Sequence, residues 1–358
     1  MHHRISQIDQ FHVKLSKGVE EVKALVLAGG SGERFWPLST FETPKQFLKL
    51  FNNKSLLRLT LERLLHRLHP DDIYIVTLSD YTDKTRQEAP EIPPGNVLGE
   101  PYKRNTAAAC VFGTSVLEPD EIVLVVPADH RIMEVEKFWN DVEKAVEGVK
   151  KYGGLFTFGI VPSRPETGYG YIEADEELEE GIFKIKQFRE KPNLETAMEF
   201  LEMGNFFWNS GMFVWKAKDF LEEVRLYAPE LYHQFEGRNL RNQEVLKAIY
   251  KNVTPISVDY AVMERSRRVR MVKASFDWSD VGNWASIREI EGYTADRGNV
   301  VIVDGERVYV RSGGKPVALV GLSDVIVIDT EKGLLIAHEE KLQKVREVVR
   351  KLRERSLD

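Results

Sequence analysis

The chain has 358 residues, 42% of them hydrophobic and 30% charged, which indicates a globular protein with a sizeable core and excludes a disordered or fibrous chain. Its 50 basic and 56 acidic residues give a net charge of −6, so no excess of cations is available to displace counterions from a nucleic acid. The sequence has no apolar run near the ~18 residues of a membrane span and no apolar signal-peptide core in residues 1–21, so we expect a cytoplasmic protein that binds neither nucleic acid nor membrane.

The first half of the chain alternates short apolar runs with helical patterns. Strands are expected near 24–28, 73–77 and 122–126, and helices near 55–68, 106–117 and 135–151. Ser55 is a suitable N-cap for the first helix, and Cys110, the one cysteine, is expected to be buried in the second. This alternation predicts an α/β fold, with a mostly parallel sheet covered by helices on both faces and ligands at the carboxyl ends of its strands.

The second half begins with strands expected near 169–173, 182–189 and 212–215, a helix near 194–203, and two or three further helices. From 299 to 338, short apolar runs separated by turn residues predict a small all-β unit. A charged amphipathic helix is expected over 341–353. Its apolar stripe would pack on its own domain or on a second copy of the chain, so a homodimer is possible from the sequence. The expected organisation is an N-terminal extension (1–21), a large domain (22–292) and a small C-terminal domain (293–358).

The segment LVLAGGSGERFWPLSTFETPKQFLKL, residues 25–50, has the features of a phosphate cradle. An apolar strand ends at Ala28 and is followed by three glycines and two cations: Gly29, Gly30, Gly32, Arg34 and Lys45. Glycines let backbone N–H groups approach an anion, and the cations would neutralise it. The Walker motif is excluded because Glu33 follows the last glycine, and the dinucleotide fingerprint because Phe35 replaces its third glycine. On glycine spacing alone, an ordinary strand-to-helix turn is the alternative.

LAGGSGERFWPLS followed by PKQFL resembles the signature of the sugar-nucleotide pyrophosphorylases, in the form found in bacterial mannose-1-phosphate guanylyltransferases. The resemblance extends from about Lys23 to the C-terminus. It implies a Rossmann-like sheet and a short left-handed β-helix near the C-terminus. It also implies the transfer of GMP from GTP to α-D-mannose 1-phosphate, giving GDP-mannose and pyrophosphate. In such an enzyme Arg34 would hold the departing pyrophosphate, and Lys45 would lie near the reacting phosphates.

Two aspartates are expected to hold the Mg²⁺ that the resemblance implies. Asp129 follows the strand near 122–126, where the alternative is a helix cap for the segment that begins near Met133. Asp280 lies in DWSDVGNW, where it is equally suited to cap a helix that starts at Asn283. Mg²⁺ binds through one or two carboxylates plus phosphate oxygens, which fits a triphosphate substrate.

The resemblance assigns the remaining residues to the two ligands. The nucleotide would contact Ala28, Gly29, Gly30, Gly32, Glu100, Asn105 and Thr106. Glu100 is a candidate acceptor for the N–H donors of guanine. For Asn105 and Thr106, a helix cap is an equally good interpretation. The sugar phosphate would contact Gly168, Glu190, Lys191 and Asn209. Of these, Lys191 would hold the phosphate, and the amide of Asn209 can both donate to and accept from hydroxyls. A surface turn is the alternative for 190–192.

Other functions are compatible with the same residues. A sibling enzyme would use another nucleoside triphosphate or sugar 1-phosphate, and a non-catalytic relative would keep the fold as a sugar-nucleotide sensor. The sequence places no Ser/His/Asp or Cys/His set together, which fits a transfer without a covalent enzyme intermediate. A second catalytic domain is not expected, because only about 60 residues follow Asn299.

Overall fold

A computed structural model describes residues 22–30, 32–295 and 298–356, and the contacts within it divide the chain into two units. Of the described residues, unit 1 contains those from Val22 to Gly29 together with Leu61–Pro127 and Met133–Asp277. Unit 2 contains Gly30–Thr60, Ala128–Ile132 and the residues from Trp278 onward. The expected extension over 1–21 lies outside the described residues.

Unit 1 is built on a nine-stranded sheet with the order β3-β2-β1-β4-β8-β5-β9-β7-β6. Its strands are β1 (Val22–Ala28), β2 (Ile73–Leu78), β3 (Val97–Glu100), β4 (Ile122–Pro127), β5 (Leu155–Ile160), β6 (Gly170–Glu179), β7 (Ile182–Glu190), β8 (Phe206–Lys216) and β9 (Val269–Lys273). β1 pairs in parallel with both β2 and β4, while β7 and β8 run against their neighbours. The mixed, mostly parallel sheet predicted from the alternating pattern is therefore confirmed.

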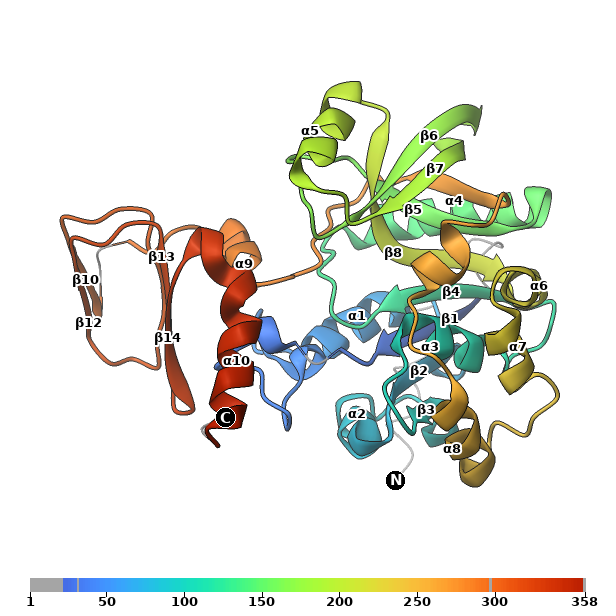
Figure 1. Ribbon diagram of the computed structural model, residues 1–358, viewed down its shortest axis with the longest axis horizontal. Helices are drawn as coiled ribbons and strands as arrows, with labels where there is room; N and C mark the ends of the chain where they lie inside the picture. Colours follow the sequence, from blue (N-terminus) through green and yellow to red (C-terminus); the bar gives the residue numbers. More distant parts are fainter. Residues whose placement is uncertain (1–21, 31, 296–297, 357–358) are drawn as a thin grey trace, which may run out of the picture. The chain divides into compact units, whose positions relative to one another are not determined.

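Helices cover both faces of this sheet. They are α1 (Leu56–Leu65, shared with unit 2), α2 (Thr82–Glu88), α3 (Asn105–Thr114), α4 (Val135–Tyr152), α5 (Leu194–Met203), α6 (Ala217–Tyr227), α7 (Pro229–Phe235), α8 (Gln243–Asn252) and the π-helical turn η6 (Asp259–Met263). Val123 and Leu124 are consecutive in β4 and both fully buried, so neither face is open there. α3 contacts β1 and β2, and α4 contacts β5, β8 and β9 (Figure 1). None of the helices in the described part of the chain is long and apolar enough to cross a membrane.

Two strands are longer than predicted, β6, which continues to Glu179, and β8. The expected strand over 212–215 is the end of β8, which begins at Phe206 and includes Asn209 and Gly211. These polar and flexible residues are typical of a loop, but here they continue the pairing with β5, where the register shifts between Thr157 and Gly159. A β-bulge thus accommodates residues that the sequence pattern excluded from the strand.

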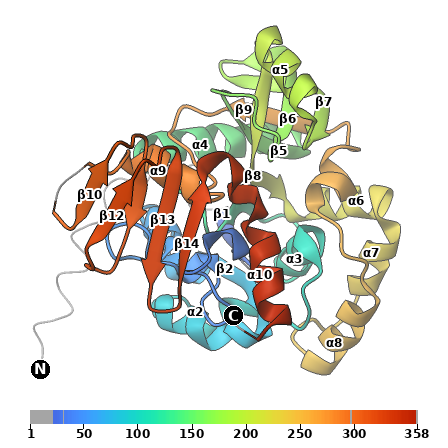
Figure 2. The ribbon, with the colours of Figure 1, turned by 60° about the vertical axis from the view of Figure 1, so that its left-hand side comes forward.

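Unit 2 joins the glycine-loop segment to the C-terminal strands. Its elements are η1 (Glu33–Phe35), η2 (Lys45–Phe47), α9 (Trp284–Glu291), β10 (Val300–Val303), β11 (Tyr309–Arg311), β12 (Val317–Val320), β13 (Val325–Thr330), β14 (Gly333–His338), η7 (Glu339–Lys344) and α10 (Val345–Glu354). β10 pairs in parallel with β12, and β11 with β13, as in the stacked turns of a β-helix. β14 lies beside β13 and α10 follows it (Figure 2). The C-terminal all-β unit predicted from the sequence is therefore present.

The C-terminal helix differs from its prediction in where it begins. The α-helix starts at Val345 rather than 341, because 339–344 forms a 3₁₀ turn capped by the ring of His338, which accepts from the N–H of Glu340 at 3.3 Å. Val345 and Val349 are buried in the core of unit 2. Most of the apolar stripe therefore packs on its own unit, although Val348 is exposed.

The core of unit 2 contains residues from both ends of the sequence. The ring of Phe35 meets that of Trp284 edge-on with centroids 5.3 Å apart, and Trp284 Nε1 donates to the carbonyl of Trp36 at 3.2 Å. Leu335 of β14 and Val349 of α10 belong to the same buried cluster. The segment that carries Arg34 and Lys45 therefore takes its conformation from the C-terminal part of the chain.

Candidate functional site

The glycine loop has one position that only glycine can occupy. Gly32 has a φ of 65°, and a Cβ built on it would lie 2.4 Å from Lys45 Cβ and 2.8 Å from its backbone nitrogen. The carbonyl of Gly32 also accepts a hydrogen bond of 2.6 Å from Ser39 Oγ. The close approach fixes η1, which carries Arg34, against η2, which begins with Lys45.

Lys45 connects the two aspartate-bearing segments of unit 2. Its Nζ lies 2.7 Å from Asp129 Oδ2 and donates to the backbone oxygen of Asp280, also at 2.7 Å. Lys45 is only 7% exposed, so its charge needs these partners. Burial by itself would raise the pKa of Asp129, but the Lys45 ammonium, together with His130 and a backbone hydrogen bond, outweighs burial and holds that pKa below its ordinary value. Asp129 is therefore a carboxylate at neutral pH.

Neither aspartate serves as the helix cap that the sequence left as an alternative. α4 has no side-chain cap, and the amides of Met133 and Glu134, which precede it, both donate to Asp277 Oδ1 at 2.7 Å. α9 is capped by Asn283, whose Oδ1 accepts from the N–H of Ala285 at 2.7 Å. The capping alternatives for Asp129 and Asp280 are thus wrong.

Two backbone hydrogen bonds hold the aspartate-bearing segments together. Arg131 N donates to Ser279 O at 2.9 Å, and Ser279 N donates to Arg131 O at 3.0 Å. Gly282 leaves room for the Asp280 side chain, because a Cβ there would lie 2.6 Å from Asp280 Oδ2. The two carboxylates are therefore carried on segments that are tied to each other.

The donor set of unit 2 matches a hard cation with few protein ligands. Within residues 22–30, 32–295 and 298–356, no group of three or more His, Cys, Asp or Glu side chains is arranged to enclose a metal ion. Two aspartates beside a glycine loop are instead what Mg²⁺ uses when phosphate oxygens and waters complete its shell. Asp129 and Asp280 fit Mg²⁺ bound together with a phosphate and do not fit a structural zinc site.

Glu100 lies buried at the carboxyl end of β3. It is 5% exposed, and its Oε1 accepts a hydrogen bond of 3.0 Å from the hydroxyl of Tyr250. Burial raises the pKa of Glu100 to about 8, against the opposite effects of the Tyr250 hydrogen bond and the Lys103 charge. A Cβ built on Gly29 would lie 3.7 Å from Glu100 Oε2, so the end of β1 runs beside this carboxyl group. Tyr250 has no part in the sequence motifs and was not predicted.

The start of α3 is tied to the segment after α8. Thr106 Oγ1 accepts from the N–H of Val258 at 2.9 Å, and Arg104 Nε donates to the carbonyl of Tyr250 at 2.7 Å. Asn105 has a φ of 67° and its Oδ1 accepts from the next amide, that of Thr106, at 2.8 Å. Arg104 was expected to be solvated, and its contact with Tyr250 corrects that expectation, whereas Lys103 is exposed.

Three of the four predicted sugar residues, Glu190, Lys191 and Asn209, fall into one cluster with an unpredicted carboxylate. Lys191 forms an ion pair with Glu190, and a Cβ built on Gly170 would lie 2.4 Å from Glu190 Oε2. Asn209 Nδ2 donates to Asp259 Oδ1 at 3.0 Å. Burial raises the pKa of Asp259 to about 7, and the nearby Glu190 charge acts in the same direction.

The amide of Asn209 is already occupied by protein partners. Its Oδ1 accepts from Thr157 Oγ1 at 3.0 Å and from the N–H of Gly211 at 3.2 Å, and its Nδ2 donates to Asp259. Asn209 is therefore a fixed side chain with little capacity left for a ligand. Gly168 is exposed, and its N–H donates to Glu166 Oε1 at 3.0 Å, so the structure does not bring it into the same cluster.

Asp259 could have been suspected from the sequence, since it is a lone charge among Val258, Ala261, Val262 and Met263. It lies in the π-helical turn η6, a form that often occurs at functional sites. The predicted residues thus gather into three groups. Unit 2 holds Gly30, Gly32, Arg34, Lys45 and the two aspartates, while unit 1 holds Ala28 and Gly29 at the end of β1, the buried Glu100 group and the Glu190 cluster.

Comparison with known proteins agrees with this arrangement. Residues 23–297 match the nucleotidyl transferase family, and residues 298–352 match the mannose-phosphate isomerase/GMP-like β-helix domain. The chain belongs to the nucleotidyl transferase family. Among curated relatives, this nucleotidyltransferase is 33% identical to the mannose-1-phosphate guanylyltransferase of Escherichia coli over 92% of its own length and 75% of the relative's. It is 35% identical to the alginate biosynthesis protein AlgA of Pseudomonas aeruginosa, over 92% of this chain and 71% of that protein.

Solved structures agree on the fold. A crystal structure from Thermus thermophilus, described as mannose-1-phosphate geranyltransferase, is 34% identical and aligns with a TM-score of 0.85 over 93% of this chain and 99% of that one. A Helicobacter pylori structure described as mannose-6-phosphate isomerase is 31% identical, with a TM-score of 0.60 over 72% of this chain and 99% of that one. The nucleotidyltransferase is thus an enzyme of the sugar-phosphate group, whose relatives include proteins of sugar-nucleotide synthesis.

Proposed function

We propose that this nucleotidyltransferase transfers GMP from GTP to α-D-mannose 1-phosphate, forming GDP-mannose and pyrophosphate. The observation that carries the proposal is the contact of Lys45 with Asp129 and with the backbone of Asp280, beside a loop whose conformation requires Gly32. A buried cation between two carboxylate segments suits a chain of phosphates and a divalent ion. The names of relatives at about a third identity support mannose and guanine as the specific ligands.

In the proposed reaction, an oxygen of the sugar phosphate attacks the α-phosphorus of GTP in line. The bond between that phosphorus and the oxygen that bridges to the β-phosphate breaks, and pyrophosphate leaves. The attacking phosphate monoester is already anionic near neutral pH, so no general base is needed, and catalysis consists of positioning and charge neutralisation. Lys191 would hold the sugar phosphate, Arg34 the departing pyrophosphate, and Lys45 the phosphate that reacts.

Asp129 and Asp280 would hold Mg²⁺, which supplies neutralisation of phosphate charge when it is bound. In the described structure Lys45 already neutralises Asp129, and its long side chain can turn toward a phosphate when a second cation shares that carboxylate. Lys45 contributes most to the lowered pKa of Asp129 in the described structure, and a bound cation would take over that role when Lys45 turns away.

Glu100 is the residue proposed to select guanine. A carboxylate can accept from both N1–H and the N2 amino group, which adenine does not present in the same pattern. In the absence of a base, burial raises the pKa of Glu100 to about 8, so the group is mostly protonated at neutral pH. Two donors from guanine would favour the ionised form, and binding of GTP should therefore release a proton. Glu190 and Asp259 are the carboxylates proposed to recognise sugar hydroxyls.

The test is a matrix of four nucleoside triphosphates against mannose, glucose and galactose 1-phosphates, with pyrophosphate release measured with and without Mg²⁺. The proposal expects the highest kcat/KM for GTP with mannose 1-phosphate, and activity only with a divalent cation. A different best pair would identify a sibling enzyme, and no release from any pair would refute the catalytic proposal. Asp129→Asn is the inactive control, because it keeps the side-chain shape and removes the charge.

We also propose that the enzyme works in the cytoplasm, where nucleoside triphosphates are available, and that it can form a homodimer. Sedimentation at several concentrations tests the second point, and a single monomeric species at every concentration would exclude it.

A further inference from the structure

Unit 1 contains a cavity whose lining includes none of the residues assigned above to substrates. It has a volume of about 520 Å³ and is lined by α3, α6, α7 and the segment after α7. Its apolar wall includes Val111, Leu221, Phe235 and Leu240. A cavity of this size and composition is within the range that holds small organic ligands.

The charged residues of this cavity leave an excess of positive charge. Three cationic side chains, including Lys218, line the cavity against two acidic ones, Glu222 and Glu236. The other two cations are Arg225 and Arg238, and neither has a side-chain ion pair or hydrogen bond with any residue in the described part of the chain. Two guanidinium groups without partners beside an apolar wall favour an organic anion.

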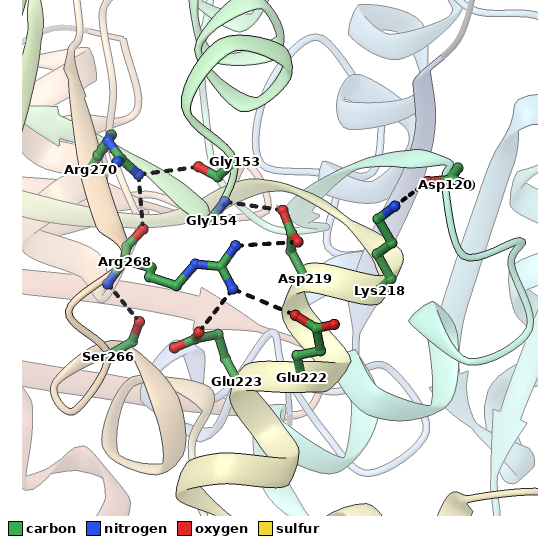
Figure 3. Close-up of polar contacts among 10 residues, drawn as sticks. All are labelled: Asp120, Gly153, Gly154, Lys218, Asp219, Glu222, Glu223, Ser266, Arg268 and Arg270. Carbon is green, nitrogen blue, oxygen red and sulfur yellow. Dashed lines mark hydrogen bonds and ion pairs between the residues drawn. The ribbon is translucent and has the colours of Figure 1, made fainter.

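The wall formed by α6 is held rigidly on its other side. Arg268, at the start of β9, pairs with Asp219 and Glu223 at 3.3 Å each and with Glu222 (Figure 3). Asp219 also accepts from the N–H of Gly154 at 3.0 Å. The α6 wall of the cavity is therefore held in place by ion pairs with β9 and its flank.

A chain of aromatic contacts leads from this cavity to Glu100. Phe235, in the cavity wall, meets Tyr250 edge-on with ring centroids 5.8 Å apart. Phe112 of α3 meets the same ring at 6.2 Å, and the Tyr250 hydroxyl donates to Glu100. A ligand that displaces Phe235 would thus act on the group that positions Glu100, which gives a physical route for coupling between two ligands.

We propose that this cavity binds a small organic anion with an apolar ring, through Arg225 and Arg238, and that its occupancy changes the affinity for GTP through Phe235 and Tyr250. The coupling rests on the proposed role of Glu100 in guanine recognition, whereas the binding does not. The two parts can therefore be measured separately.

The probe for binding is 1-anilinonaphthalene-8-sulfonate, an aromatic anion whose fluorescence rises in an apolar site. We expect one saturable site per chain and at least about tenfold weaker binding in the double variant Arg225→Gln/Arg238→Gln. Arg241→Gln is the matched control, because Arg241 is an exposed arginine nearby that does not line the cavity. This variant should bind the probe with the same affinity as the wild type. Ser115→Trp, which fills the cavity from α3, should remove the site. The uncharged N-phenyl-1-naphthylamine should bind the wild type and the double variant equally.

The coupling is measured by equilibrium dialysis of labelled GTP with and without saturating probe. A change of about fivefold or more in the GTP dissociation constant, absent in Ser115→Trp, supports the proposal. No saturable probe site, or a site indifferent to both arginines, would overturn the binding. Probe binding with unchanged GTP affinity would overturn the coupling. Failure to bind GTP at all would refute the proposed function, while the probe titration would still report on the cavity.

Discussion

The hydroxyl of Tyr250 donates a hydrogen bond of 3.0 Å to Glu100, and both side chains are buried. The two residues are 150 positions apart in the sequence, and they join the end of β3 to α8. The Tyr250 hydrogen bond lowers the pKa of Glu100, but burial outweighs it and leaves the group mostly protonated at neutral pH, which gives this carboxyl group a measurable effect on stability.

Glu100 should make the folded state less stable as the pH rises. Its pKa is about 8 in the folded chain against 4.5 when solvated, so the folded state binds more protons between these values and stability falls across them. The loss is fully developed above pH 8 and amounts to about 4–5 kcal/mol. Glu100→Gln should unfold at the same urea concentration as the wild type near pH 4.5, and at a higher one at pH 9. Glu230, an exposed glutamate on α7, provides the control, since Glu230→Gln should show the same dependence of the urea midpoint on pH as the wild type. If Glu100→Gln also showed that dependence, the raised pKa would not belong to Glu100.

Gly32→Ala should destabilise unit 2 by more than its backbone conformation alone explains. A positive φ costs a non-glycine residue about 1–2 kcal/mol, and the contact at 2.4 Å with Lys45 Cβ should add about 1–3 kcal/mol. Gly204→Ala is the control, because Gly204 has a φ of 72° but nothing within 4 Å of a built Cβ. Chemical denaturation of both variants measures the difference. Equal losses would mean that η1 and η2 adjust to the added methyl group.

Leu335→Ala should loosen the glycine-loop segment from a distance. Leu335 lies in β14 and packs in the buried cluster that contains Phe35 and Trp36, so its truncation should cost about 2–4 kcal/mol. Hydrogen exchange of the amides over 33–39 should accelerate in this variant. Leu334→Ala, at the exposed neighbouring position, should change the stability by less than about 0.5 kcal/mol and leave exchange unaltered. Unchanged exchange in Leu335→Ala would show that the loop holds its shape independently.

Arg34→Ala should lower turnover about a hundredfold or more while it leaves the KM for the sugar 1-phosphate within about threefold. The reason is that its positive charge is proposed to act on pyrophosphate as it departs and not on the sugar. Arg34→Lys should recover part of the rate, because it restores the charge without the two-pronged geometry. Steady-state kinetics with each substrate varied provide the measurement, and near-normal kcat in Arg34→Ala would exclude the role.

The sequence predicted the residues that lie in short motifs, but not those that are brought in by packing. Lys45 was identified from its place after the glycine loop, and the structure sets it against Asp129. Tyr250 was missed because it lies in a helical stretch whose pattern is that of an ordinary core, and nothing local distinguishes it from a packing side chain. Asp259 stands out locally as a charge in an apolar stretch, but its contact with Asn209, 50 positions away, is not indicated by the sequence.

The domain organisation shows a similar limit. The periodicity of the C-terminal strands was sufficient to predict a β unit, since alternation within each strand is a local property. The membership of Gly30–Thr60 in that unit could not be predicted, because it depends on contacts such as Trp284 with Trp36 that span 248 positions. Burial of large aromatic rings, and not the motif itself, decides where the loop packs.

The packing of Phe35 against Trp284 also bears on how the protein is made. The chain is synthesised at about 5–20 residues per second, so the glycine loop leaves the ribosome early and the C-terminal strands that complete its core leave it last. The sheet of unit 1 can begin to form on the nascent chain, but Phe35 and Trp36 have only Leu48, Leu50 and Leu56 among the buried residues of their cluster until the residues from Val281 onward emerge. The glycine-loop segment should therefore be among the last parts to complete its packing, and exposed aromatic residues in the unfinished chain are natural targets for chaperones.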